Sequence, residues 1–298
     1  MTTLLPQEQM ISRVRDVCHA DARVVAALMY GSFTKGEADA YSDIEFVIYI
    51  DDADLATFDA VVWLERIAPV ALYFVNEFSV GTAIFENLIR GEFHFDPASS
   101  MAQVRTWRNE AGFPDPSAML ILDRTGELIT HLAQISGPGP DRTEPATVAW
   151  HWHTYLNWIL FGAGILARGE RARALEILWF VQRCLLRFAR LIEGSTDHWQ
   201  TPSKNVENDL SPETCRRYIA CTASLANDAL ECAYAAAWTW GNELARTLSV
   251  TQKLVPNEAL LATMDERFTI WLRPNPNRDT VTPGPTHRVR PHLPNHDS

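Results

Sequence analysis

Apolar and polar residues alternate with a period of two in several short segments of the first third of the chain. In the segment SDIEFVIYI, residues 42–50, the isoleucines and the phenylalanine fall on one face of a predicted strand, while Asp43 and Glu45 share the other face. The alternation in residues 88–96 predicts a further strand, and short apolar segments bounded by turn residues predict strands over 23–30, 69–80 and 81–87. The first third therefore contains the strands of a sheet.

Helical periodicity appears before, between and after these strands. Apolar residues recur every three or four positions in residues 6–19 and 52–68, and the second of these segments begins with aspartates that can cap a helix. Residues 99–135 also have a mainly helical pattern. Beyond them, long helical patterns cover residues 147–169, 171–194, 211–249 and 257–272.

The change from strands to helices predicts two domains. The segment SGPGPDRTEP, residues 136–145, is the strongest internal break, so we expect a first domain over residues 1–136 and a linker over 137–144. A helical bundle over 145–272 follows, and the tail of 273–298, rich in proline, asparagine and arginine, is expected to be disordered. The predicted fold class is α+β, with a mixed β-sheet and flanking helices followed by a C-terminal helical bundle.

Composition excludes some classes of protein. The chain has a net charge of −11. Residues 1–97 carry six Lys and Arg against sixteen Asp and Glu, which disfavours a nucleic-acid partner. The five cysteines have no metal-binding spacing and suit a reducing compartment. No apolar run approaches the roughly 20 residues of a membrane span, so we expect a soluble, cytoplasmic protein without a membrane partner.

The acidic strand suggests a metal site. Side chains two positions apart on a strand lie about 6.6 Å apart, so Asp43 and Glu45 can approach one hard cation such as Mg²⁺. The turn Gly31-Ser32, ten residues before Ser42-Asp43, can offer backbone N–H groups and a hydroxyl to phosphate oxygens. Glu92, on a later strand, is the expected third carboxylate, as a metal ligand or general base.

Other polar residues are weaker candidates. His94 shares the predicted strand face of Glu92 and could contact a substrate, although a single histidine on a sheet is more often structural. A polyanion bound to an acidic domain needs cations, and Lys35 and Lys204 are the first candidates for phosphate contacts, with Lys253 a lesser one. Each could equally be a solvated surface charge.

The spacing of these motifs resembles a known superfamily. Gly31-Ser32, Asp43-Ile44-Glu45 and Glu92 look like the conserved elements of nucleotidyltransferases related to DNA polymerase β. The segments MYGSFTKGEADAYSDIEF and GEFHF are similar to those of the lincosamide nucleotidyltransferases of the antibiotic-resistance class. Glu45 stands where the commonest superfamily pattern has a second aspartate, which keeps a carboxylate on a longer side chain.

This resemblance implies an adenylyltransferase of the EC 2.7.7 type. It would transfer AMP from ATP to a hydroxyl of a lincosamide such as lincomycin or clindamycin, with two Mg²⁺ ions held by Asp43, Glu45 and Glu92 and the nucleotide phosphates held at Gly31 and Ser32. The implied partners are a small-molecule antibiotic and a nucleoside triphosphate, and the implied assembly is a homodimer. One alternative is the same reaction with an aminoglycoside as the acceptor. The other is a nucleotidyltransferase-fold antitoxin or binding module.

Overall fold

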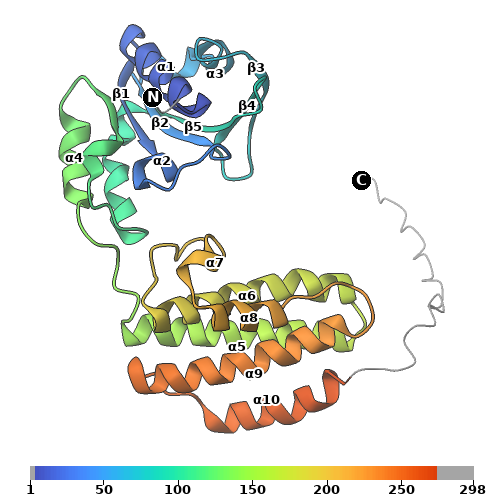
Figure 1. Cartoon of the computed structure of the whole chain (residues 1–298). Coiled ribbons are helices and arrows are strands. Elements are labelled where there is room, and N and C mark those ends of the chain that lie inside the picture. The colour runs from blue at the N-terminus through green and yellow to red at the C-terminus, as the bar shows by residue number, and fades with distance from the viewer. Residues whose placement is uncertain (1–3, 274–298) are drawn as a thin grey trace, which may run out of the picture. The chain divides into compact units, whose positions relative to one another are not determined.

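The computed structural model describes residues 4–273, and the chain divides into two compact units on either side of the bond between Pro140 and Asp141 (Figure 1). The division lies inside the segment expected to be a linker. The tail expected to be disordered lies outside the described residues, apart from Arg273. In the described part of the chain, no helix combines the length and apolar character that a membrane span requires.

The first unit contains a six-stranded mixed sheet, as expected from the alternating segments. Its strands, in chain order, are β1 (Val24–Tyr30), β2 (Ile44–Ile50), β3 (Val70–Val75), β4 (Gly81–Phe85), β5 (Arg90–Pro97) and β6 (Leu120–Asp123). Its helical segments are α1 (Pro6–Ala20), α2 (Ser32–Lys35), η1 (Leu55–Thr57), α3 (Ala60–Leu64), η2 (Ala98–Asn109), η3 (Pro116–Met119) and α4 (Glu127–Ile135).

The strand order is β3-β4-β5-β2-β1-β6, in which β2 and β5 pair in parallel and all other neighbours are antiparallel. The apolar face of β2 packs with residues of α1 and α3, and Phe46 stacks on Phe93 of β5 at 5.5 Å between ring centroids. The opposite face is covered by η2 and α4 only over its later part, where Val47 and Tyr49 are buried. The beginning of β2 and β5 on this second face therefore carries the polar residues.

Two sequence expectations in the first unit are wrong. Residues 52–68 do not form one helix but a short 3₁₀ turn, η1, and the short helix α3, whose start is capped by the Asp59 side chain. Residues 120–123 belong not to a helix but to the edge strand β6, which pairs with β1. A four-residue apolar segment is too short for its periodicity to distinguish a strand from a helix. Residues 120–123 form a strand because they pair with the otherwise free edge of β1.

The second unit is helical, as expected. Its helices are α5 (Pro145–Ala167), α6 (Arg171–Glu193), α7 (Val206–Asp209), α8 (Pro212–Ala220), α9 (Ala229–Thr251) and α10 (Glu258–Trp271), and Figure 1 shows α5, α6, α9 and α10 lying along one another. The closest approaches use glycine, because a Cβ on Gly162 would come within 2.1 Å of the Tyr234 hydroxyl and one on Gly241 within 2.0 Å of the Tyr155 hydroxyl. Both hydroxyls donate to backbone carbonyls and are fully satisfied in the core.

The helix expected over residues 211–249 is interrupted. Residues 221–228 form turns between α8 and α9. Asn227, near the end of this segment, has a φ of 43°, a left-handed conformation that does not occur within a regular α-helix. The Asn227 carbonyl accepts a hydrogen bond from Arg171 of α6, so a tertiary contact stabilises this turn. The segment between the two helices is rich in serine, threonine, asparagine and aspartate, which bond to nearby backbone groups and weaken helices.

Candidate active site

The polar residues expected to be functional lie at the start of β2 and β5. In the parallel pairing of these strands Glu45 is opposite Glu92 and Val47 is opposite His94, so Glu45, Glu92 and His94 share one face of the sheet. Asp43 directly precedes β2 and stands beside Arg90, the first residue of β5. The period of two predicted from sequence therefore places these side chains on a common face.

Arg90 joins two of the three carboxylates. Its guanidinium Nη1 donates to Asp43 Oδ2 and its Nη2 donates to Glu92 Oε1. The side chains of Arg90, Asp43 and Glu92 are 44%, 30% and 22% exposed, so this ion-pair cluster is open to solvent. A positive charge already lies between these two carboxylates.

Glu45 is packed against the turn that follows β1. Gly31 has φ of +80°, and a Cβ at this position would come 1.4 Å from Glu45 Oε2, which no side chain can tolerate. Gly31 is therefore required both for its left-handed backbone and for the space that the Glu45 carboxylate occupies. The expected phosphate-binding turn and the expected metal-binding strand are in direct contact.

Ser32 begins the short helix α2, which ends at Lys35. The Ser32 hydroxyl oxygen is buried and has no hydrogen-bond partner in the described part of the chain. Buried polar groups are nearly always paired, so an unpaired hydroxyl beside the acidic residues indicates a position where a ligand oxygen can bind. Lys35 is exposed at the end of the same helix.

His94 is held by a tyrosine. Its Nε2 lies 3.1 Å from the hydroxyl of Tyr30, the last residue of β1, and Tyr30 also packs edge-on against Trp107 at 5.5 Å between ring centroids. Burial raises the pKa of Tyr30, and the negative charges of Glu45, Glu92 and Asp43 raise it further. The Tyr30 hydroxyl therefore stays protonated, and all three carboxylates contribute to its raised pKa.

Asp96 extends this polar row along β5. It lies two residues beyond His94 on the same face, and burial raises its pKa while the neighbouring His94 lowers it. Burial thus makes Asp96 a weaker acid than an ordinary aspartate.

A hollow of about 530 Å³ opens beside the cluster. Asp43 and Arg90 line it together with the loop of residues 40–42 and the turn of residues 87–89. Gln7 of α1 fixes the loop by donating to the carbonyls of Ala40 at 3.0 Å and Ser42 at 3.1 Å. The acidic cluster therefore borders a space in which a ligand can lie.

The described residues contain no group of three or more His, Cys, Asp or Glu side chains arranged to hold a metal ion. In the cluster, Arg90 binds Asp43 and Glu92, and the Glu45 carboxylate lies against Gly31. The donor set still fits Mg²⁺, because carboxylate oxygens are its preferred ligands and Asp43 and Glu92 already share one cation.

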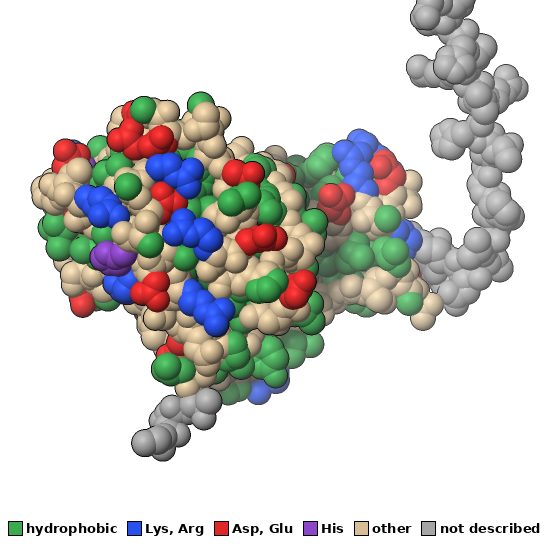
Figure 2. Space-filling view, turned by 90° about the horizontal axis from the view of Figure 1, so that it is seen from above, with side chains coloured by type: hydrophobic (Ala, Val, Ile, Leu, Met, Phe, Trp, Pro, Cys, Tyr) green, Lys and Arg blue, Asp and Glu red, His purple; other side chains and the backbone are tan. Residues whose placement is uncertain are grey.

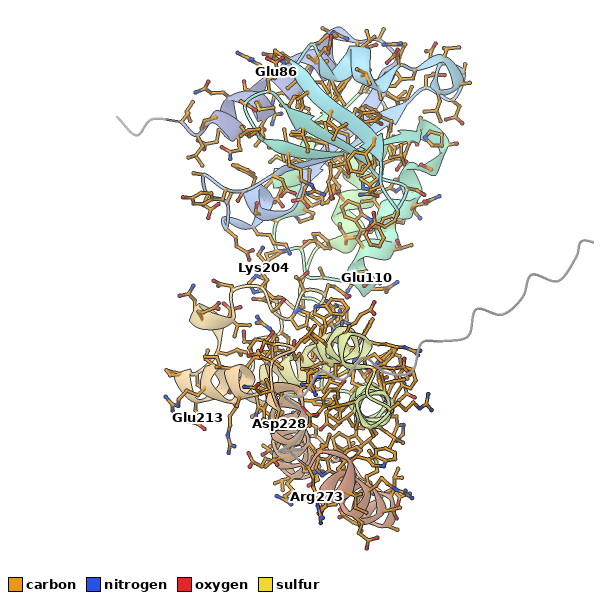
Figure 3. The ribbon with its side chains drawn as sticks, turned by 90° about the vertical axis from the view of Figure 1, so that its right-hand side faces the viewer. Glu86, Glu110, Lys204, Glu213, Asp228 and Arg273 are labelled. Atoms are coloured by element: carbon orange, nitrogen blue, oxygen red, sulfur yellow. The ribbon has the colours of Figure 1, made fainter. Side chains whose placement is uncertain are left out.

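Lys204 lies in the second unit, in the segment between α6 and α7 (labelled in Figure 3). The segment is held by Arg190, a fully buried residue of α6 whose guanidinium donates to the carbonyls of Pro202 and Lys204 and to Asp209. His153 is exposed and His151 is buried on α5, as expected of residues two positions apart on a helix. On the face drawn in Figure 2, the Lys and Arg side chains of the described residues are interspersed with Asp and Glu.

Sequence reasoning missed Arg90, Tyr30 and Asp96. A usable signal existed for Arg90 and Asp96, because each is an even number of positions from Glu92 and so shares its face of β5. Nothing in the sequence pairs Tyr30 with His94, since that contact depends on the order β5-β2-β1 in the sheet.

Comparisons with known proteins give partial matches. The crystal structure of an aminoglycoside 6-adenyltransferase from Bacillus subtilis matches with a TM-score of 0.41 and 12% identity, covering 90% of this chain and 100% of that one. The crystal structure of a nucleotidyltransferase-like protein from Exiguobacterium sibiricum matches with a TM-score of 0.37 and 14% identity, covering 87% of this chain and 80% of that one. A search of curated proteins finds no match.

The family comparison concerns the helical unit. Residues 145–267 match the family model described as "Lincosamide nucleotidyltransferase-like, C-terminal domain". This range covers α5 to α9 and most of α10. The helical unit of this chain is thus a domain similar to the C-terminal domain of lincosamide nucleotidyltransferase-like proteins.

Proposed function

We propose that this protein is a nucleotidyltransferase that transfers AMP from ATP to a hydroxyl group of a lincosamide antibiotic. The observation that carries the reaction is the contact between the Gly31-Ser32 turn and Glu45, on a sheet face that Asp43 and Glu92 share. The match of residues 145–267 supports the acceptor class. An enzyme that modifies such a small molecule needs no basic surface for a nucleic acid.

Asp43, Glu45 and Glu92 would hold Mg²⁺, which when bound neutralises the phosphate charge and polarises the phosphoryl group. The Gly31 backbone and the unpaired Ser32 hydroxyl would bind phosphate oxygens at the turn that lies against Glu45. Lys35 and Lys204 are proposed as additional positive charges for the triphosphate.

In the transfer step, the acceptor oxygen forms a bond to the α-phosphorus while the bond from that phosphorus to pyrophosphate breaks. The proton of the acceptor hydroxyl passes to Glu92, whose Oε1 accepts a hydrogen bond from Arg90. His94, positioned by Tyr30, would contact the acceptor.

The test is incubation of the purified chain with Mg²⁺, ATP and a panel of lincosamides and aminoglycosides, with products identified by mass spectrometry. We expect one adenylyl group on a lincosamide. The Asp43→Asn variant should lose on the order of 10²–10³-fold in rate, while the exposed-site control Asp16→Asn keeps the wild-type rate. Adenylylation of an aminoglycoside alone would replace the acceptor, and full activity of Asp43→Asn would contradict the role of Asp43.

A further inference from the structure

We propose that Arg90 exchanges places with the metal at Asp43 and Glu92: it pairs with both carboxylates when no divalent cation is bound, and turns to the nucleotide phosphates when one is. This inference rests on the proposed function, and it makes Arg90 a positioning and nucleotide-binding residue of that site. It accounts for a basic residue that sequence reasoning did not connect with the acidic strand.

The position of Arg90 follows from strand register. Arg90 begins β5, which pairs in parallel with β2 so that Gly91 is opposite Ile44 and Arg90 falls beside Asp43. Glu92 is two residues further on the same face of β5. The guanidinium spans the two carboxylates with one N–H donor to each, which its planar fork permits and a lysine ammonium would match less well.

The pairing and metal binding are mutually exclusive at these oxygens. A divalent ion ligated by Asp43 Oδ2 and Glu92 Oε1 would have to take the positions where the Arg90 N–H groups now bind. Two cations this close also repel each other. Binding of the ion at these two oxygens therefore requires the guanidinium to leave them.

The Arg90 side chain can move away from the two carboxylates into the neighbouring hollow. It is 44% exposed, so its departure uncovers no apolar core, and it lines the hollow of about 530 Å³ next to Asp43. A guanidinium released there remains at the edge of the site, where phosphate oxygens can accept its N–H groups. The positive charge that pairs with the two carboxylates then binds the polyanion.

This exchange predicts two effects of opposite sign in the Arg90→Gln variant. Without nucleotide, the variant should bind Mn²⁺ about tenfold more tightly, because two charge-assisted hydrogen bonds no longer have to break. With Mg²⁺ present, it should bind a non-hydrolysable ATP analogue about tenfold more weakly, because a phosphate contact is lost. A purely structural role for Arg90 would weaken both.

The experiment measures both affinities by isothermal titration calorimetry on the full chain, with Mn²⁺ binding checked by electron paramagnetic resonance. Arg90→Lys should recover part of the nucleotide affinity. Arg66→Gln is the matched control, since Arg66 forms an ion pair with Asp21 in the same unit and is 39% exposed. It should leave both affinities unchanged, and melting curves establish that each variant is folded.

The outcomes separate this inference from the proposed function. An unchanged or weaker Mn²⁺ affinity in a folded Arg90→Gln variant that still transfers AMP overturns the exchange alone. Absence of Mn²⁺ binding in both the wild type and Arg90→Gln overturns the exchange together with the metal site. Tighter Mn²⁺ binding with weaker nucleotide binding supports the exchange.

Discussion

The carboxylate of Glu45 occupies the space where any residue other than glycine at position 31 would place its Cβ. This contact joins the turn after β1 to the start of β2 and brings the turn proposed to bind phosphate against an acidic strand. Glu45 cannot move toward Gly31, and Gly31 cannot gain a side chain without displacing Glu45. The geometry of the site depends on this pair.

Gly31→Ala should therefore displace Glu45 and abolish AMP transfer. Gly36→Ala is the matched control, because Gly36 also has positive φ, of 71°, but a Cβ there meets nothing within 4 Å. Backbone strain should cost Gly36→Ala about 1 kcal/mol of unfolding free energy, measured by urea denaturation, because Gly36 is in the αL region. It should cost Gly31→Ala more, because φ of 80° with ψ of −153° is a conformation that essentially only glycine adopts. Only Gly31→Ala should lose activity and additional stability, and equal effects of the two substitutions would contradict the contact.

Glu92→Gln should lower kcat by on the order of 10²–10⁴-fold, since glutamine cannot accept the proton of the acceptor hydroxyl. Rapid-quench measurement of AMP transfer gives the rate of the step. Glu86→Gln, in the exposed turn between β4 and β5 (labelled in Figure 3), should leave the rate unchanged. A Glu92→Gln rate within about tenfold of wild type would assign the general base to another group.

His151 should make stability depend on pH. Burial, together with the charges of Arg187 and Arg142, lowers the pKa of His151 to about 4. The folded chain thus favours the neutral form of His151 over the protonated form. The free energy of unfolding is therefore at its full value above the unfolded pKa of about 6.5 and decreases as the pH falls toward 4. The free energy of unfolding should therefore fall by about 3 kcal/mol between neutral pH and pH 4.

The measurement is the free energy of unfolding from urea denaturation between pH 7 and pH 4. His151→Gln should flatten the part of the curve below about pH 6.5, although it also perturbs the packing of this ring between Trp150 and Trp199. His153→Gln, at an exposed position on the same helix, should keep the wild-type slope. Parallel curves for wild type and His151→Gln would show that His151 does not titrate in this way.

Arg190→Met should destabilise the helical unit by about 3 kcal/mol, because the buried guanidinium satisfies three backbone carbonyls and Asp209. Limited proteolysis should then cleave the segment between α6 and α7 faster. Arg173→Met is the control, since Arg173 is 52% exposed, pairs with exposed Glu170 and lies over the Phe161 ring at 5.5 Å from its centroid. It should change stability by less than about 1 kcal/mol. Similar proteolysis of both variants would contradict the role of Arg190.

Local periodicity was enough to predict much of this protein. The alternation in β2 and β5 placed Asp43 and Glu45 on one face of the first strand and Glu92 and His94 on one face of the second, because a strand turns successive side chains to opposite sides whatever it pairs with. The long apolar repeats of α5 and α6 predicted the helical unit for a similar reason, since a pattern sustained over many turns outweighs local exceptions.

Tertiary structure decided the contacts between segments. The register of β2 against β5 brings Arg90 beside Asp43, the neighbouring β1 brings Tyr30 to His94, and the free edge of β1 draws residues 120–123 into the sheet. Such contacts join residues far apart in the chain, and the choice of partner and register depends on the free energy of the whole core rather than on any one segment. For this reason the shared faces of the acidic residues could be read from the sequence, while the pairing of Arg90 with Asp43 across two strands could not.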